Sequence, residues 1–481
     1  MKFRFALIAP VIVSCTMALS QPNQAPPTGP MDQGPQMGQP NGGPGGPGGS
    51  MGQGAPSTVV QPDGKVTFSL NAPTATSVKL SAEYPIVPGG GMGMSANKSL
   101  PMTKDDKGVW SITVGPLASD IYTYAFIVDG LSIVDPRASF TLNGRSAFFV
   151  HGVGSANYEF EPKIPHGTVS KVWYDSAVYK ASHRMVIYTP PSYESSTARY
   201  PVLYLLHGGG ADETSWSEQA RATQIFDNLI AQGKMVPSIV VMPNGGSGSP
   251  GYSSKEATLP KAQGQGGPGG RGPGAPGGPG GAGGPGAPGM GMPNAMGESA
   301  SQAVGENGRA TFLASLIQEI IPFVDKTYRT KADADDRAVA GQSGGGGETI
   351  LSSMNNLDKF GWAGAFSPGW PDVPQGFWAS IPKPADADLR RGPEVGRSIN
   401  PPVFESLVPK LGPEVNSHLH LFYFGVGDAD GLVETEQAIA KVFDEKGVKY
   451  QWVEKHGYGH DWAVWRINLQ EFASKMFQPG Q

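Results

Sequence analysis

The pentapeptide Gly341-Gln342-Ser343-Gly344-Gly345 constrains this chain more than any other feature. It follows a run of small apolar residues at 338–340 and precedes helix-compatible sequence at 348–354. Between a strand and a helix, this pattern predicts a sharp turn that holds Ser343 at positive φ, with glycines where a side chain would clash. Successive glycines also fit a plain flexible loop. The strand–turn–helix context favours the strained turn and makes Ser343 a candidate nucleophile.

The sequence around this turn predicts a parallel α/β sheet. From about residue 164, short apolar runs alternate with segments of helical periodicity, as in sheets whose strands are joined by helices. The run at 200–206 is almost wholly apolar, which indicates a strand buried on both faces. We expect strands at 184–189, 200–206, 238–242, 337–341, 419–426 and 450–454, and helices at 310–328, 432–446 and 462–477.

A second glycine motif, His207-Gly208-Gly209-Gly210, directly follows the strand at 200–206. Glycine lets the backbone approach a developing oxyanion, which one N–H from such a loop and one from the residue after the nucleophile stabilise. The candidate donors are the amides of Gly209 and Gly344. The alternative is a turn that needs positive φ. We expect His207 itself to be structural.

A serine nucleophile needs a general base. Two of the eight histidines lie late enough in the chain for the order serine, carboxylate, histidine. His460 lies in a glycine-bearing loop before the last expected helix, and His456 directly follows the strand at 450–454. We favour His460 on this placement. His418 and His420 lie within or beside a strand, where a structural histidine is the simpler interpretation.

The carboxylate that orients the base is expected at the end of the preceding strand. The strand at 419–426 runs into Gly427-Asp428-Ala429-Asp430-Gly431, which offers both Asp428 and Asp430. We favour Asp430 and keep Asp428 as the alternative. A calcium loop is the competing use of this turn, but the further oxygen ligands of an EF-hand are not at the required offsets.

Residues 57–162 have a different pattern, which predicts a β-sandwich. Trp110 and Tyr124 lie in its expected strands, where a core position is favoured over stacking on a sugar. The alternating runs lie at 66–70, 78–80, 109–114 and 122–128, and the turn dipeptides are Asp63-Gly64, Lys107-Gly108, Asp129-Gly130 and Asn143-Gly144.

Glycine and proline, with 69 and 45 residues, make up about 24% of the 481-residue chain, against roughly 12% in ordinary proteins. The excess lies mostly at 21–56 and 250–296, which are predicted to be a disordered tether and a disordered insertion. The second segment has a three-residue glycine period, but the run is too short for a collagen helix and is broken at both ends. The remainder suffices for one large and one small domain.

The N-terminus is typical of an export signal. Lys2 and Arg4 precede an apolar run at 5–13 and a small-residue cleavage site, so residues 1–20 predict a signal peptide. Alternatively, the four residues ending at Cys15 resemble a bacterial lipobox, whose cysteine is lipidated. Both interpretations predict a periplasmic or extracellular protein, with a membrane anchor only if Cys15 carries lipid.

Charge and cysteine content exclude several classes. The net charge is −5 and no Lys/Arg run is present, so the sequence lacks the cluster of basic residues that nucleic-acid binding requires. Cys15 is the one cysteine, which excludes an internal disulfide and a cysteine-based metal site. No apolar run is long enough for a stable bilayer span. No metal or organic cofactor is implied, and the oligomeric state stays open.

Residues from about 169 to 477 resemble the esterase D and feruloyl esterase group, carbohydrate esterase family one, to which enterochelin esterases and mycolyltransferases are related. The resemblance implies an α/β-hydrolase fold over 163–481 and carries two roles onto this sequence. In the family, the aspartate that closes the Gly-x-x-Asp turn is the carboxylate of the catalytic triad, and in this sequence it is Asp430. The histidine of the family's Gly-His-Asp-Trp motif is the base, and in this sequence it is His460. The matching stretches are YTPPSY (188–193), YPVLYLLHGGGADETSW (200–216), RAVAGQSGGG (337–346), GVGDADGL (425–432) and GYGHDWAVW (457–465).

Two departures from the family pattern are present. Gly344 stands where the family usually has methionine, which keeps the amide donor but removes a side chain that would pack against the acyl group. The insertion at 250–296 has no expected counterpart. Residues 57–162 resemble the early-set, glycogen-binding-type module found in front of bacterial esterases. The features that carry this second resemblance are GVWS (108–111), YTY (122–124), VDG (128–130) and DPR (135–137).

The resemblance implies an exported carbohydrate esterase that removes feruloyl or acetyl groups from a plant polysaccharide or oligosaccharide. A siderophore-type trilactone esterase shares the same three side chains, but the leader segment argues against it. A non-catalytic glycan-binding protein on a hydrolase fold is the third interpretation. Four aromatic residues on loops near the expected active-site face are candidates to bind a sugar or a feruloyl ring: Trp370, Trp378, Tyr458 and Trp462.

Overall fold

The computed structural model describes residues 56–82, 86, 99–142, 144–245, 306–369 and 401–478. Within the chain, Pro56–Gln481 form one compact unit. Among the described residues, no helix combines the length and the apolar character needed to cross a bilayer. Several of the sequence predictions fall outside the described residues: the leader at 1–20, all of the tether at 21–56 except its last residue, the insertion at 250–296, Trp370 and Trp378.

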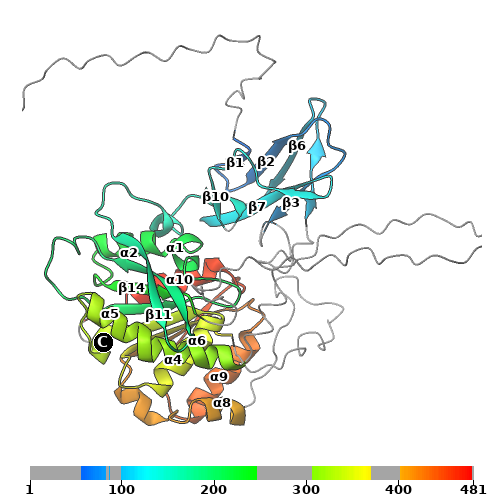
Figure 1. Cartoon of the computed structure of the whole chain (residues 1–481). Helices are drawn as coiled ribbons and strands as arrows, with labels where there is room; N and C mark the ends of the chain where they lie inside the picture. Colours follow the sequence, from blue (N-terminus) through cyan, green and yellow to red (C-terminus); the bar gives the residue numbers. More distant parts are fainter. Residues whose placement is uncertain are drawn as a thin grey trace, which may run out of the picture. The chain divides into compact units, whose positions relative to one another are not determined.

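The N-terminal part forms two antiparallel sheets (Figure 1). Their side chains share one apolar core. Phe68, Tyr124 and Phe148 pack edge to face in this core, with ring centroids 4.9 and 5.4 Å from Phe68. Trp110 and Tyr124 are buried, which confirms their predicted core position. The first sheet has the order β1 (Thr58–Val60), β2 (Val66–Asn71), β6 (Val109–Val114), β5 (Thr103–Lys104); the second has the order β4 (Leu100–Pro101), β3 (Val78–Ala82), β7 (Asp120–Val128), β10 (Arg145–Val150), β9 (Phe140–Leu142), and β8 (Leu131–Ile133) pairs with β7.

An eight-stranded sheet forms the centre of the larger part. Its first three strands pair antiparallel and all later neighbours pair parallel. The strand order is β11 (Thr168–Ser176), β12 (Ala181–Thr189), β14 (Ile239–Pro243), β13 (Val202–Leu206), β15 (Arg337–Gln342), β16 (Trp362–Phe366), β17 (Leu421–Gly427), β18 (Gln451–Lys455).

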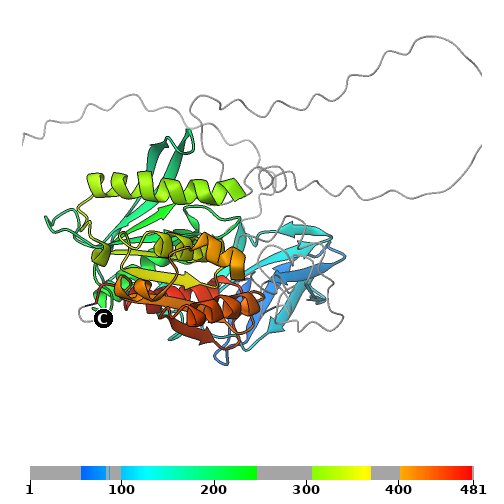
Figure 2. The ribbon, with the colours of Figure 1, turned by 90° about the horizontal axis from the view of Figure 1, so that it is seen from below.

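Helices cover both faces of this sheet (Figure 2). Side chains of α4, α5, α6, α8 and α9 share one apolar core with the sheet, and those of α1, α2 and α10 share the other. The helices are α1 (Ser215–Glu218), α2 (Ala222–Ala231), α4 (Glu306–Ser315), the π-helical turn η2 (Leu316–Ile320), α5 (Ile321–Thr327), α6 (Gly344–Asn355), α8 (Pro401–Leu407), α9 (Val433–Glu445) and α10 (Trp462–Ala473), with short 3₁₀ turns η1 (Ala156–Tyr158), η3 (Ala334–Asp336) and η4 (Pro413–Ser417).

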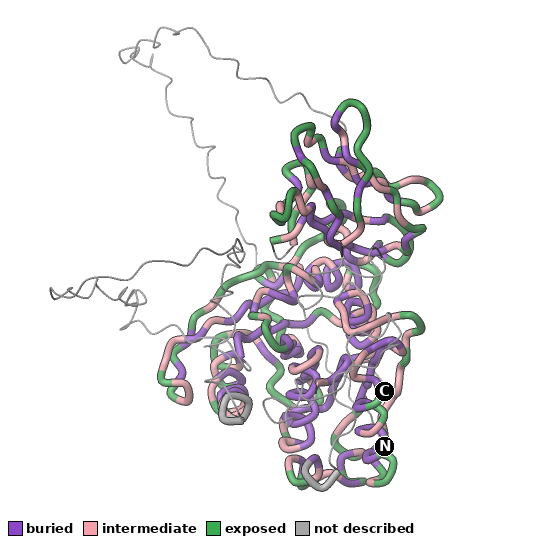
Figure 3. The backbone as a smooth tube through the Cα atoms, turned by 90° about the vertical axis from the view of Figure 1, so that its right-hand side faces the viewer, coloured by how far each residue is buried: buried purple, intermediate pink, exposed green. Residues whose placement is uncertain are grey.

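The parallel strands bring separate loops to one edge of the sheet. Strands β13, β14, β15 and β16 are buried along their whole length, so they fix the positions of the loops that follow them. Figure 3 shows buried and exposed segments of the backbone by colour. In open α/β sheets, ligands bind at the carboxyl ends of the strands. At this edge lie the predicted glycine loop after β13, Ser343 after β15 and the acidic turn after β17.

Candidate active site

Ser343 lies in the turn between β15 and α6, with φ 53° and ψ −119°, which is the strained conformation that the glycine pattern predicts. Two backbone hydrogen bonds hold the turn: Ser343 N–H donates to the carbonyl of Phe366 (2.9 Å), and Gly369 N–H donates to the carbonyl of Ser343 (2.7 Å). A Cβ at Gly345 would lie 2.5 Å from the carbonyl oxygen of Leu206. Glycine is therefore required there by the close approach of the neighbouring strand.

A continuous hydrogen-bonded chain joins three side chains that are far apart in the sequence. His460, in the loop between β18 and α10, lies with Nε2 2.9 Å from Ser343 Oγ. Its Nδ1 is 2.9 and 3.1 Å from the two carboxylate oxygens of Asp430. Asp430 is fully buried and also accepts a hydrogen bond from the amide of Leu432 (2.8 Å). The arrangement can deprotonate a serine hydroxyl and hold the resulting imidazolium.

The two alternative residues lie together, apart from this chain. His456 Nδ1 is 2.5 Å from Asp428 Oδ2, and the His456 side chain is 98% exposed. Asp428 also accepts the amide hydrogen of Gly457 (2.7 Å). The structure therefore brings His460 and Asp430, rather than His456 and Asp428, to Ser343.

The carboxylates around His460 favour its charged form. Burial lowers the pKa of His460, but attraction to Asp430, the hydrogen bond with Asp430 and the charge of Asp461 outweigh it and raise the pKa above the ordinary value of 6.5. Asp461 caps α10, where its carboxylate accepts the amide hydrogen of Val464 (3.2 Å). Desolvation raises the pKa of Asp461 to about 6. Two carboxylates thus favour the imidazolium: Asp430, which is hydrogen-bonded to it, and Asp461, the next residue in the chain.

The predicted oxyanion loop packs against Ser343. A Cβ at Gly208 would lie 2.9 Å from Ser343 Cβ, so only glycine permits this approach. Gly209 is exposed beside it, and Gly344 is the first residue of α6, where no helix carbonyl accepts its amide hydrogen. Gly210 has φ 73°, so the motif also contains a positive-φ turn. His207 is buried and lies 3.4 Å from the amide of Gly245, which fits a structural role.

Among the aromatic candidates, the structure corrects the prediction for Trp462. This residue is the first of α10 rather than part of a loop, and it is 6% exposed. Its ring packs edge to face on Trp216 and Trp465, at 5.3 and 5.1 Å, so no face is open to a sugar. Tyr458 is half-buried in the loop before His460.

Sequence reasoning missed the turn that follows β16. Ser367 has φ 42°, is fully buried, and donates its amide hydrogen to the carbonyl of Gly425 (2.7 Å). A Cβ at Gly369 would lie 3.2 Å from the carbonyl carbon of Ser343, so this turn packs directly against the backbone of Ser343. The Ser-Pro-Gly sequence after an apolar run at 362–366 was the available signal.

Across the described residues, no three His, Cys, Asp or Glu side chains gather as a metal site would require.

Comparison with known proteins places this geometry in a family. A family model described as "Putative esterase" matches residues 176–270 and 294–475. A Xylanibacter ruminicola protein named endo-1,4-beta-xylanase/feruloyl esterase is 29% identical over 428 residues, which cover 87% of this chain and 46% of that protein. An esterase of Mycobacterium tuberculosis is 29% identical over 182 residues, or 37% of this chain and 27% of that protein. The chain thus spans less than half the length of these relatives.

A solved structure supports the fold. The enterobactin esterase of Shigella flexneri is similar with a TM-score of 0.54 and 16% sequence identity, covering 86% of this chain and 93% of that one. At this identity the similarity concerns the fold alone. The family match is stronger, because it spans more than half of the chain and includes Ser343, Asp430 and His460. This chain therefore belongs to the esterase family, on an α/β-hydrolase fold.

Proposed function

We propose that this protein is an exported serine carboxylesterase that removes feruloyl or acetyl groups from plant-type polysaccharides. The observation that carries the proposal is the hydrogen-bonded chain from Ser343 Oγ through His460 to Asp430, at a strained turn. In this proposal Ser343 is the nucleophile, His460 is the general base and Asp430 is the orienting carboxylate. The fully buried position of Asp430 suits that role, because it keeps water from competing for the imidazole.

The first half of the reaction forms an acyl-enzyme. Ser343 Oγ attacks the ester carbonyl carbon while His460 Nε2 takes its proton, and Asp430 stabilises the imidazolium. The carbonyl oxygen becomes an oxyanion, which the amides of Gly209 and Gly344 stabilise by roughly 3–4 kcal/mol each. His460 then returns the proton to the alcohol oxygen of the sugar as the ester C–O bond breaks.

The second half releases the acid. Water attacks the acyl carbon of the Ser343 ester and gives a proton to His460. Collapse of the second oxyanion breaks the bond to Ser343 Oγ, which recovers its proton from the imidazolium. The net reaction is ester plus water to acid plus alcohol, and no other reactant is consumed.

The substrate class rests on the relative from Xylanibacter ruminicola, whose name contains feruloyl esterase and whose similarity extends over 87% of this chain. Tyr458, half-buried in the loop before His460, is the described aromatic residue proposed to contact the sugar or the feruloyl ring. We propose the same role for Trp370 and Trp378, which follow the turn after β16 in the sequence.

Two further parts of the proposal concern the rest of the chain. The two-sheet region is proposed to be an immunoglobulin-like module of the early-set type, ending near residue 162, with the esterase domain at 163–481. Its sheets of four and six strands over one core support this. Residues 1–20 are proposed to direct export, with lipid on Cys15 as the variant that anchors the protein to a membrane. Intact mass of the mature protein distinguishes the two.

The experiment that tests the function measures hydrolysis of methyl ferulate, acetylated xylan and enterobactin by the purified protein. We expect turnover of at least one of the first two, and a loss of roughly 10⁴-fold or more in Ser343→Ala and His460→Ala. His456→Ala is the matched control, since this exposed histidine lies four residues away and is expected to keep activity within twofold. Turnover of enterobactin alone would assign the siderophore function. No turnover of any ester would leave a binding protein.

A further inference from the structure

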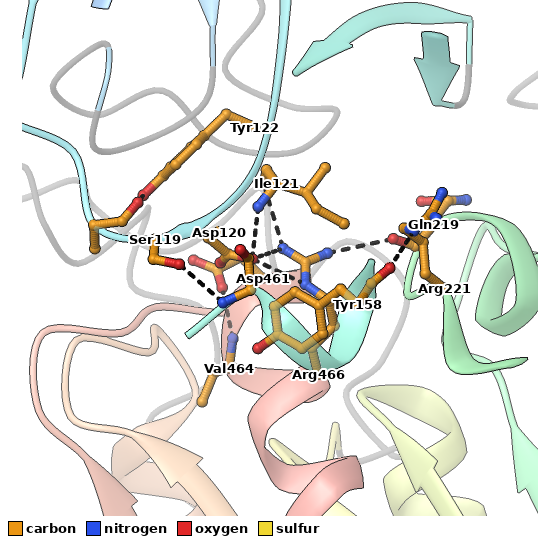
Figure 4. A network of polar contacts seen from close by, with 12 residues as sticks. Ser119, Asp120, Ile121, Tyr122, Tyr158, Gln219, Arg221, Asp461, Val464 and Arg466 are labelled. Atoms are coloured by element: carbon orange, nitrogen blue, oxygen red, sulfur yellow. Dashed lines mark hydrogen bonds and ion pairs between the residues drawn. The ribbon is translucent and has the colours of Figure 1, made fainter. Parts of the chain in front are cut away.

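A buried ion pair joins the two-sheet region to the esterase fold. Asp120, the first residue of β7, is 6% exposed, and Arg466 on α10 is 3% exposed. Arg466 donates two hydrogen bonds to Asp120 Oδ1, from Nη2 at 2.8 Å and from Nε at 3.2 Å (Figure 4). The two residues are 346 positions apart in the chain. A pair that is this deeply buried holds its partners in one geometry, because either charge alone would be left without water.

The guanidinium has further fixed neighbours around this pair. It donates to the carbonyls of Gln219 (3.3 Å) and Ile121 (3.4 Å), and it lies over the ring of Tyr158 at 5.2 Å (Figure 4). Ile121 and Tyr158 are buried in the same apolar core as α10. The two-sheet region and the segment that follows it therefore contribute to the core beneath α10.

The proposed general base lies directly before the N-terminal turn of α10. His460 immediately precedes Asp461, the residue that caps this helix. The His460 ring packs edge to face on Trp465, with centroids 5.0 Å apart, and Trp465 is the neighbour of Arg466. Any shift of this helical turn would move the imidazole relative to Ser343, which α6 and β15 hold independently.

We propose that Asp120 is a positioning residue for the esterase site: by pairing with Arg466 it fixes the first turn of α10, and with it the imidazole of His460, at hydrogen-bond distance from Ser343. The inference rests on the proposed function. Asp120 touches neither substrate nor reacting atoms. It acts on the chemical step rather than on substrate binding, because the group it positions is the base.

Asp120→Asn tests this positioning role with little change in packing, since it keeps the size of the side chain and one acceptor oxygen but removes the negative charge. The matched control is Asp325→Asn. Asp325 pairs with Arg337, which is 3% exposed, at 2.9 Å, so the control also leaves a buried arginine without its carboxylate. Arg337 begins β15, at the opposite end of that strand from Ser343. Both variants are measured as full-length protein for thermal unfolding and for kcat and KM on p-nitrophenyl acetate and methyl ferulate.

We expect Asp120→Asn to lower kcat about 10- to 100-fold with KM within twofold, because small misplacements of a catalytic group cost rate rather than binding. Asp325→Asn is expected to lose similar thermal stability while kcat stays within twofold. Arg466→Lys changes the other partner of the same ion pair: it keeps the positive charge but removes the paired N–H donors. It should also lower kcat.

Equal kcat in Asp120→Asn, Asp325→Asn and wild type would overturn the inference. A loss of kcat in both aspartate variants, in proportion to their loss of thermal stability, would overturn it as well. If Asp120→Asn does not accumulate as folded protein, Arg466→Lys decides by the same criterion. Wild type that cleaves p-nitrophenyl acetate but not methyl ferulate would count against the proposed substrate, while the activated ester still reports on Asp120.

Discussion

At the scale of single residues, the pKa of His460 makes a direct prediction. In its proposed role as general base, His460 must be neutral to accept the proton of Ser343. Its pKa is raised above 6.5, so the imidazolium, which cannot act as a base, persists to higher pH than for a free histidine. We expect kcat/KM on methyl ferulate to fall as pH decreases through a midpoint above 6.5. His456→Ala should keep the same profile. A flat profile between pH 5 and 8 would contradict the assignment of His460 as the base.

Glu436 supplies a second residue-scale prediction, on stability. This α9 side chain is fully buried, and neither carboxylate oxygen has a hydrogen-bond partner within the described part of the chain. Desolvation, together with the charges of Asp430 and Glu454, raises its pKa well above 4.5. The unfolded chain releases this proton at lower pH than the folded protein does. Glu436 therefore costs increasing stability as pH rises above 4.5.

We expect Glu436→Gln to raise the free energy of unfolding by more at pH 8 than at pH 5, measured by urea denaturation at both pH values. Glu434→Gln, on the exposed face of the same helix, is the control and should change little at either pH. An equal effect of Glu436→Gln at the two pH values would show that Glu436 has the same pKa in the folded and unfolded protein.

At the scale of secondary-structure elements, the packing of the turn between β15 and α6 predicts what replacing one of its glycines does to activity and stability. A Cβ at Gly345 would meet the backbone oxygens of Leu206 and His207 at 2.5 and 2.6 Å, so Gly345→Ala must push the glycine loop away from Ser343. We expect kcat to fall about 100-fold and stability to fall by roughly 1–3 kcal/mol. Gly364→Ala in β16 is the control, since its Cβ would meet only the rings of Phe472 and Phe366, at 3.0–3.1 Å. It should lose stability but keep kcat within threefold.

The elements that sequence predicted well are those with a strong local pattern. Strand β13 is apolar throughout and β6 alternates, and both were expected within two residues of their observed ends. Strand β11 was missed because most of it is exposed and only Tyr174 and Ser176, near its end, are buried. Strand β16 was not predicted either, although it is buried throughout. The helix expected at 310–328 contains the π-helical turn η2, and the last helix ends at Ala473 rather than 477, because packing rather than periodicity sets these details.

The same distinction applies to the candidate site: residues with a local sequence pattern could be predicted, and residues without one could not. The sequence predicted that Ser343, His460 and Asp430 lie together, and they do, because each lies in a loop that follows a parallel strand. The Asp120–Arg466 pair was not, since no local pattern links residues 346 positions apart. Trp462 was proposed as a ring-binding loop residue although it also begins the helix predicted at 462–477, because no local pattern shows that its side chain is buried against Trp216 and Trp465.

At the scale of the whole molecule, the two-sheet region and the esterase fold are expected to be inseparable. A chain beginning at residue 163 would leave Arg466 without Asp120 and uncover the core around Trp465. We expect this shortened chain to unfold at lower temperature and to lose kcat, whereas a chain beginning at residue 56 keeps both. Full kcat in the chain from 163 would show that the esterase fold stands alone.

The central claim is that Ser343 is activated by His460 and Asp430. Its most direct test is the reaction with a fluorophosphonate, which bonds to an activated serine oxygen with loss of fluoride, followed by peptide mass mapping. The account predicts one adduct, on Ser343, whose formation slows by orders of magnitude in His460→Ala and stays unchanged in His456→Ala. An adduct on another serine, or none on the folded protein, would contradict it.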